Sequence, residues 1–115
     1  MNAAIVVVTY NRAESLKRLL QSLAKADYRG RSRIPLIISV DKSNSEACAK
    51  AAEEFSWEYG EKRVIRQVER LGLKRHILEC GAYSREYDGI IMLEDDLVVA
   101  PDFYEYAVRA LEFSE

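Results

Sequence analysis

Ala4-Ile5-Val6-Val7-Val8-Thr9-Tyr10-Asn11-Arg12 places a continuous apolar run directly before a polar stretch near the start of the chain. Residues 36–40 and 89–93 form apolar runs of the same kind, whereas residues 63–68 alternate more, with Val64 and Arg66 on one face. Continuous apolar runs are typical of strands that are covered on both faces, as in a parallel sheet. We therefore predict strands over 4–8, 36–40, 63–68 and 89–93, with the third nearer an edge.

Four segments with helical periodicity lie between and after these strands. Asn11 with Glu14, and Ser43 with Glu46, resemble helix start signals, and Pro101 suits the first turn of a last helix. The stripes predicted to be buried are Leu16, Leu19, Leu20, Leu23 and Ala24; Ala47, Cys48, Ala51, Ala52 and Phe55; Leu73, Ile77, Cys80 and Ser84; and Phe103, Tyr106, Ala107, Ala110 and Leu111. The alternation predicts an α/β fold of four βα units around a parallel sheet.

The length and composition indicate one ordinary globular domain over residues 1–115. The chain is 49 % hydrophobic and 31 % charged with a net charge of −2, which excludes wholesale disorder and any strong attraction to nucleic acid or anionic membranes. The longest apolar run is too short for a membrane span, and the start lacks a basic signal-peptide region. Two cysteines, Cys48 and Cys80, are expected in the core of a cytoplasmic protein. Residues 28–35 are expected to form the main flexible connection.

Polar residues follow all four predicted strands, and the third runs out through Glu69-Arg70-Leu71-Gly72. Thr9-Tyr10-Asn11-Arg12 ends the first, Asp41 the second, and Glu94-Asp95-Asp96 the fourth. Parallel sheets bind ligands beyond the carboxyl ends of their strands, and the first and fourth strands are expected to be neighbours flanking one crevice. Adjacent carboxylates repel one another unless a cation such as Mg²⁺ or Mn²⁺ relieves them, which predicts a metal and phosphate site rather than a solvated strand end.

Two further groups allow more than one interpretation. Asp41 could accept ribose hydroxyls or a base edge, or could simply stabilise a turn. Arg70, Lys74 and Arg75 surround Gly72 at the start of the third helix, where they could bind a diphosphate or form a solvated basic face.

The remaining candidates are expected to be structural. His76 is the only histidine and has no partner in sequence, so we expect it on the surface. The aromatic residues expected to pack or line a rim are Trp57, Tyr59, Tyr83 and Tyr87. The chain lacks a dinucleotide-binding glycine motif, a P-loop, a nucleophile elbow and zinc-ligand spacing.

Residues 5–12 resemble the opening of GT-A-type glycosyltransferases, the large family 2 group in particular. Asp41, the loop at 70–73 and the acidic motif after the fourth strand follow in that family's order. The segment 94–106 is similar to the Glu-Asp-Asp segment of β-1,2-N-acetylglucosaminyltransferases. The resemblance implies a three-layer α/β/α, Rossmann-like GT-A sheet that binds a nucleotide-sugar donor, a UDP-sugar being expected, with Mn²⁺ or Mg²⁺.

The resemblance also implies a role for each matching residue. Thr9, Tyr10 and Arg12 would line the base pocket, Asp41 would contact the base or ribose, and Asp95 would lie beside the ribose or diphosphate. Asp96 would bind the metal with support from Glu94. Independently of the resemblance, Gly72 and Lys74 are expected at the nucleotide-sugar because they lie at the start of the third helix.

No catalytic base is identifiable within residues 1–115. In the family that the chain resembles, the base and most of the acceptor site come later in the sequence, so we expect the base beyond Glu115. The 115 residues are accordingly expected to be the donor half of a longer enzyme, incomplete for catalysis by themselves.

Two other functions stay open at this point. One is a receiver-like regulatory domain that binds Mg²⁺ in an acidic pocket, although the first strand here ends in Thr-Tyr-Asn-Arg instead of an acidic pair. The other is a non-catalytic interaction domain whose carboxylates only solvate the sheet. An uncovered strand edge would in addition favour a homodimer.

Overall fold

The computed structural model of the protein describes residues 2–113. Strands and helices alternate in the order β1 (Ala4–Thr9), α1 (Ala13–Lys25), β2 (Leu36–Val40), α2 (Ala47–Glu54), β3 (Lys62–Arg66), α3 (Leu73–Gly81), β4 (Ile90–Glu94) and α4 (Phe103–Phe113), with a short 3-10 helix, η1 (Ala82–Arg85), after α3. The predicted strands agree with these bounds to within two residues, and the four predicted βα units are confirmed.

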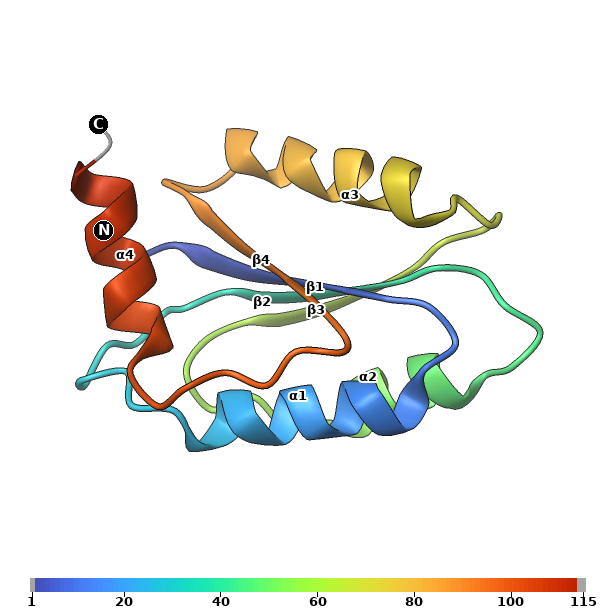
Figure 1. The fold of residues 1–115 in the computed structure, drawn as a ribbon, viewed down its shortest axis with the longest axis horizontal. Helices are drawn as coiled ribbons and strands as arrows, with labels where there is room; N and C mark the ends of the chain where they lie inside the picture. The colour runs from blue at the N-terminus through green and yellow to red at the C-terminus, as the bar shows by residue number, and fades with distance from the viewer. Residues whose placement is uncertain (1, 114–115) are drawn as a thin grey trace.

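The four strands form one parallel sheet in the order β3-β2-β1-β4. Ile5 on β1 lies opposite Leu36 on β2 and Ile91 on β4, so β1 is central and its carboxyl end lies between those of its two neighbours. The predicted contact between the first and fourth strands and the edge position of the third are therefore confirmed (Figure 1).

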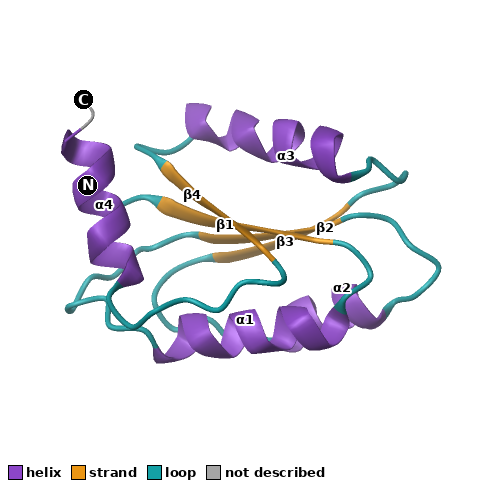
Figure 2. Cartoon of the chain, viewed as in Figure 1, coloured by secondary structure: helices purple, strands orange, loops and turns teal. Residues whose placement is uncertain are grey.

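Helices cover both faces of the sheet: α1 and α2 lie on one side and α3 on the other (Figure 2). Because side chains alternate along a strand, Ile5 and Val7 face the larger core, and Val6 and Val8 face the smaller core beneath α3. The larger core contains the buried stripe of α1: Leu16, Leu19, Leu20 and Leu23. Within residues 2–113, no helix has both the length and the apolar character needed to cross a bilayer.

The first helix begins without the side-chain cap that the sequence suggests. Arg12 occupies the N-cap position with no side-chain hydrogen bond, and Asn11 lies in the left-handed region with φ of 51°. Glu14 pairs with Lys17 at 3.2 Å instead of closing a capping box. Ala24, predicted to be in the buried stripe, is exposed.

The second helix also begins later than its start signal. Glu46 occupies the N-cap position of α2 without a side-chain cap, and the Ala47 N–H donates to the hydroxyl of Ser45 at 3.2 Å. Ser43 lies before this turn, where its hydroxyl accepts from the Ser45 N–H at 3.2 Å. The residues that α2 buries include the predicted Cys48, Ala51 and Ala52, whereas the predicted Ala47 is exposed.

The predicted buried face of α3 is correct at Cys80, and Ile77 is partly buried, but the prediction is wrong at Leu73 and Ser84. His76 and Cys80 are its buried residues, whereas Leu73 is 59 % exposed. Ser84 is exposed and belongs to the 3-10 helix that follows. Cys80, like Cys48, is buried as predicted.

The last helix lies across the amino ends of the strands (Figure 1). Its buried residues include Tyr104 and Val108, whereas two residues of the predicted stripe, Tyr106 and Ala110, are exposed, Tyr106 to 78 %. The Tyr104 hydroxyl donates to the carbonyl oxygen of Ala3 at 2.7 Å, just before β1. This docking leaves the carboxyl ends of the strands free of α4.

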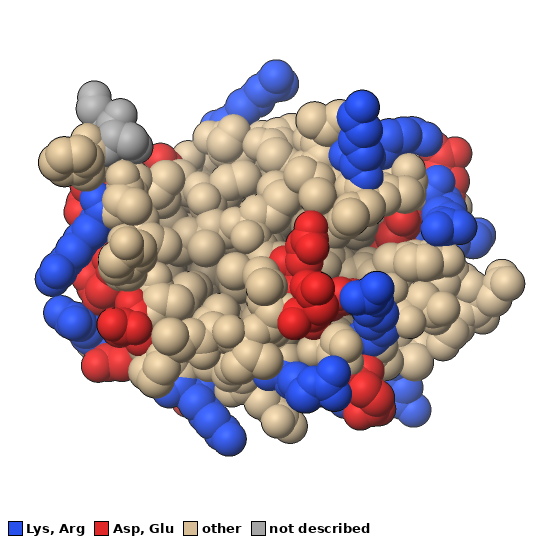
Figure 3. Space-filling view, viewed as in Figure 1, with Lys and Arg blue, Asp and Glu red and all other residues tan. Residues whose placement is uncertain are grey.

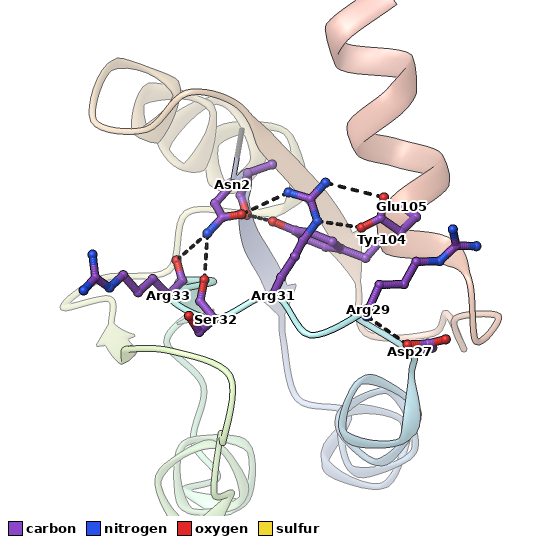
Figure 4. A network of polar contacts seen from close by, with 9 residues as sticks. Asn2, Asp27, Arg29, Arg31, Ser32, Arg33, Tyr104 and Glu105 are labelled. Atoms are coloured by element: carbon purple, nitrogen blue, oxygen red, sulfur yellow. Dashed lines mark hydrogen bonds and ion pairs between the residues drawn. The ribbon is translucent and has the colours of Figure 1, made fainter.

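The connection at residues 28–35, expected to be flexible, is anchored instead. Tyr28 and Ile34 are buried, and the Arg31 guanidinium donates to Glu105 on α4 at 2.5 Å and to the side-chain oxygen of Asn2 at 3.1 Å (Figure 4). The loop therefore ties the amino terminus to the last helix.

Candidate functional site

A pocket of about 270 Å³ opens at the carboxyl ends of β1, β2 and β4, beside the start of α3. It is lined by every residue predicted for the site except Lys74: Thr9, Tyr10, Arg12, Asp41, Gly72, Glu94, Asp95 and Asp96. Figure 3 shows acidic atoms gathered over the carboxyl end of β4, with basic side chains beside them. The topology therefore brings residues from both ends of the chain, from Val8 to Asp96, to one cavity.

Asp95 links the end of β4 to the loop after β1. The side chain is 7 % exposed, and its Oδ2 accepts from the Thr9 hydroxyl at 2.8 Å and from the Tyr10 N–H at 3.2 Å. Because a hydroxyl has one proton, the Thr9 hydroxyl already uses its only donor in the hydrogen bond to Asp95. Thr9 therefore supports the pocket wall, and Tyr10, which also lines the cavity, is held through its backbone N–H.

Cys48 on α2 holds the other end of the same loop. Its sulfur accepts from the Arg12 N–H at 3.1 Å and lies 3.6 Å from the Thr9 hydroxyl oxygen. Asn11, with its positive φ, lies between the two fixed points. The side chain of Arg12 is exposed at the pocket and forms no ion pair within residues 2–113.

Asp41 fixes the loop that leads into α3. The side chain is 2 % exposed, and its Oδ1 accepts from the N–H groups of Lys42 and Leu71 at 2.9 and 2.8 Å. Its Oδ2 accepts from the Gly72 N–H at 3.0 Å. Gly72 has φ of 79°, where a side chain would be strained. A carboxylate has about four acceptor positions, so these three bonds leave one for a ligand donor.

The three consecutive carboxylates do not converge on one point. Asp95 is turned into the protein, Glu94 is partly buried and Asp96 is exposed at the pocket. In the described part of the chain, no three His, Cys, Asp or Glu side chains gather to hold a metal ion. Mg²⁺ is often coordinated by only one or two protein carboxylates, with phosphate oxygens of the ligand and water molecules as its other ligands. The carboxylates present here fit Mg²⁺ or Mn²⁺ bound in this manner. Asp96, with Glu94 beside it, is the group available for this.

The cations near Gly72 separate into two sets. Arg70 lines the pocket, with its guanidinium carbon 4.5 Å from the centre of the Tyr10 ring. Lys74 is exposed and does not line the pocket, so the structure does not bring it to the other predicted residues. Arg75 lies 3.4 Å from Glu69 in an exposed ion pair.

His76 is a pocket residue that the sequence prediction placed on the surface. The ring is 1 % exposed, and its Nε2 lies 2.8 Å from the Ser39 hydroxyl oxygen, which also accepts from Gln67 at 3.1 Å. Burial lowers the pKa of His76, and the nearby Asp41 carboxylate opposes that shift. The sequence feature that could have indicated a buried polar partner is Ser39, because a polar residue inside the buried strand Leu36–Val40 requires a hydrogen-bond partner.

The catalytic base, expected beyond Glu115, stays a prediction. Glu115 itself lies outside the described residues, which end at Phe113 on α4. Within residues 2–113 the pocket is lined by four carboxylates, those of Asp41, Glu94, Asp95 and Asp96. Asp41 and Asp95 accept hydrogen bonds from the loops around them, and Glu94 and Asp96 are the groups that fit a metal ion.

Comparison with known proteins places the chain among glycosyltransferases. The model of the family "Glycosyl transferase family 2" matches residues 4–115. An Arabidopsis thaliana protein, alpha-1,3-mannosyl-glycoprotein 2-beta-N-acetylglucosaminyltransferase, is 31 % identical over 90 % of this chain and 26 % of its own. This match, together with the order of the strand-end residues, argues against the receiver-like alternative.

Solved structures share the fold at lower identity. S. aureus TarS in complex with UDP-GlcNAc superposes with a TM-score of 0.72 and 17 % identity, over 98 % of this chain and 32 % of its own. The mannosyltransferase PcManGT from Pyrobaculum calidifontis, in complex with GDP-Man and Mn²⁺, gives 0.76 and 18 % over 94 % and 31 %. The chain thus spans about a quarter of the Arabidopsis relative and about a third of each of these structures.

Proposed function

Because the chain belongs to glycosyl transferase family 2, we propose that its pocket binds a nucleoside-diphosphate sugar, specifically a UDP-sugar, together with Mn²⁺ or Mg²⁺. The bound donor would supply a sugar to an acceptor hydroxyl. The observation that carries this proposal is the single cavity where the ends of β1, β2 and β4 bring Tyr10, Arg12, Asp41 and Asp96 together.

The free hydrogen-bonding capacity of the pocket suits a nucleoside. Asp41 has one acceptor position left for a ribose hydroxyl or a base N–H, and it is fixed by three backbone donors. Tyr10 presents a ring on which a base can stack. Arg12 offers a guanidinium without a carboxylate partner in the described region, which suits a phosphate or a base oxygen.

The acidic end of β4 suits the diphosphate end of the donor. Asp96 would hold the metal with support from Glu94, while Asp95 keeps the loop after β1 in place. When bound, the metal supplies Lewis-acid stabilisation of the charge that develops on the departing nucleoside diphosphate.

We also propose that residues 1–115 bind the donor without transferring its sugar. Transfer to a hydroxyl needs a base, and the buried carboxylates of this pocket are already occupied by the donors that hold its loops. The Arabidopsis relative is about four times as long as the matched region, so a base beyond Glu115 and an acceptor site of its own would have room in a chain of that length. Turnover of a radiolabelled UDP-sugar by the 115-residue chain would contradict this part of the proposal.

Calorimetry with UDP and Mn²⁺ tests the donor site. We expect each ligand to strengthen binding of the other, and Asp96→Asn to weaken Mn²⁺-dependent UDP binding about tenfold or more, a loss of roughly 1.4 kcal/mol or more. Asp88→Asn is the matched control, because Asp88 is exposed before β4 and lies outside the pocket.

Three other outcomes would contradict parts of this assignment. A preference for GDP over UDP would overturn the choice of nucleotide. Binding of UDP without any dependence on Mn²⁺ or Mg²⁺ would overturn the metal. Absence of synergy together with absence of nucleotide binding would favour the non-catalytic interaction domain.

A further inference from the structure

The thiol of Cys48 lies behind the loop that joins β1 to α1. Its sulfur accepts from the Arg12 N–H at 3.1 Å, and the carbonyl oxygen of Arg12 accepts from the Leu16 N–H at 2.9 Å. Cys48 is 2 % exposed and belongs to the larger core, so the position of the sulfur is set by the packing of α2. Both backbone groups of Arg12 are therefore bound, one by α2 and the other by α1.

A chain of buried hydrogen bonds connects the same thiol to the end of β4. The Thr9 hydroxyl donates its one proton to Asp95 at 2.8 Å, so in the 3.6 Å contact between Thr9 and Cys48 the thiol is the donor. Asp95 also accepts from the Tyr10 N–H at 3.2 Å. The loop after β1 is thus held at two points, by Asp95 at Tyr10 and by Cys48 at Arg12.

The residue between these two points has a backbone conformation that needs support. Asn11 is exposed and has φ of 51°, in the left-handed region that residues other than glycine adopt only occasionally, asparagine among them. Such a conformation persists where the surrounding structure fixes it. Because the side chain of Asn11 is exposed, the bonds to the backbone on either side of it supply this constraint. Without the bond to Cys48, we expect the loop to relax and the Arg12 side chain to move from the pocket.

We propose that Cys48 is a positioning residue of the donor site, which holds the backbone of Arg12 so that the guanidinium of that residue stays at the pocket. This inference rests on the proposed function, because Arg12 is assigned there to a phosphate or a base oxygen. Binding is stronger when a contacting side chain is already placed in the free protein, since less conformational freedom is lost. Cys48 itself does not line the pocket, so it acts through Arg12 and does not touch the donor.

Calorimetry with UDP and Mn²⁺ compares two replacements of the thiol. Cys48→Ala removes the acceptor and is expected to weaken UDP binding about two- to tenfold, the size of one hydrogen bond. Cys48→Ser keeps an acceptor for the Arg12 N–H and a donor for Thr9, and is expected to retain most of the wild-type affinity. Lost packing alone would not give rescue by serine, because serine and alanine are both smaller than cysteine. Equal losses in the two variants would overturn the role of the hydrogen bond.

A variant on the same helix controls for loss of stability. Ala52 is fully buried one turn after Cys48 and does not line the pocket. Ala52→Gly should lower the free energy of unfolding in urea, because glycine is a poor helix former, and should leave UDP binding unchanged. Weakening of UDP binding by Ala52→Gly to the same extent as by Cys48→Ala would overturn the positioning role in favour of a general loosening of α2.

A double-mutant cycle tests the path through Arg12. In an Arg12→Gln background, which keeps the backbone N–H, Cys48→Ala should cause no further loss of UDP binding. An equal loss in both backgrounds would overturn the path through Arg12. Equal binding by the wild type and Cys48→Ala would overturn the role of Cys48 alone, and absence of UDP binding by the wild type would overturn the proposed function as well.

Discussion

A buried histidine beneath the pocket makes the stability of the protein sensitive to pH. Burial lowers the pKa of His76 from its ordinary value of 6.5, so the folded protein holds a neutral ring against the Ser39 hydroxyl. Below pH 6.5 the unfolded chain binds a proton that the folded protein does not bind. The free energy of unfolding must therefore fall as the pH decreases from 6.5 toward the lowered pKa of the folded state.

Denaturant unfolding between pH 7.5 and 5.5 measures this effect. We expect the free energy of unfolding to decrease over that range in the wild type and to vary less in His76→Gln, which can still bond to Ser39. The Arg31 hydrogen bond lowers the pKa of Glu105 below its ordinary 4.5, so the stability from that group is lost at more acidic pH, outside the range. The same pH dependence in both proteins would contradict this assignment.

Single residues of the pocket differ in how far the sequence could predict them. Thr9, Asp41 and Asp96 lie at or just after the carboxyl ends of apolar strands. Strand ends in a parallel sheet share one edge, so the meeting of these residues follows from the fold. His76 and Lys74 lie on α3, where position depends on the rotation of the helix. The observed rotation brings His76 to Ser39 on another element, a contact that no pattern within the helix records.

The buried face of α4 likewise differs from the face that its own sequence pattern predicts. A helical stripe through Phe103, Tyr106 and Ala110 is the more apolar choice in sequence, yet the helix buries Tyr104 and Glu105. Glu105 is accommodated because Arg31 pairs with it, and Tyr104 because its hydroxyl reaches a backbone carbonyl. Both partners lie far away in the chain, Arg31 in the loop at 28–35 and Ala3 just before β1, so a pattern within the helix does not reveal them.

The tyrosine bond offers a direct test of how α4 is attached. Tyr104→Phe removes the donor to the Ala3 carbonyl in a fully buried position and should lower the free energy of unfolding by about 1–2 kcal/mol. Tyr106→Phe, two residues later and 78 % exposed, should change it by less than about 0.5 kcal/mol. Urea unfolding of both variants measures the difference. UDP binding should be the same in both, because α4 lies at the opposite end of the strands from the pocket (Figure 1).

For the whole molecule, the two edges of the sheet differ in charge. The strand β3 carries Lys62, Arg63 and Arg66, which protect an edge against pairing with another chain. The other edge, β4, has no charged residue between Ile90 and Leu93, and most of its side chains are only partly buried. Figure 3 shows mostly uncharged atoms over this strand apart from the acidic group at its carboxyl end.

This asymmetry predicts that two copies of the 115-residue chain associate through β4. In a purified sample the partner available to an unpaired edge is a second copy, and antiparallel pairing would keep the acidic ends of the two strands apart. Sedimentation velocity should show a dimer that forms with increasing concentration. Met92→Lys on β4 should shift the protein to monomer, whereas Ile65→Lys, also partly buried against the smaller core but on the protected edge, should not. A wild-type monomer at all concentrations, or equal effects of the two lysines, would contradict association through β4.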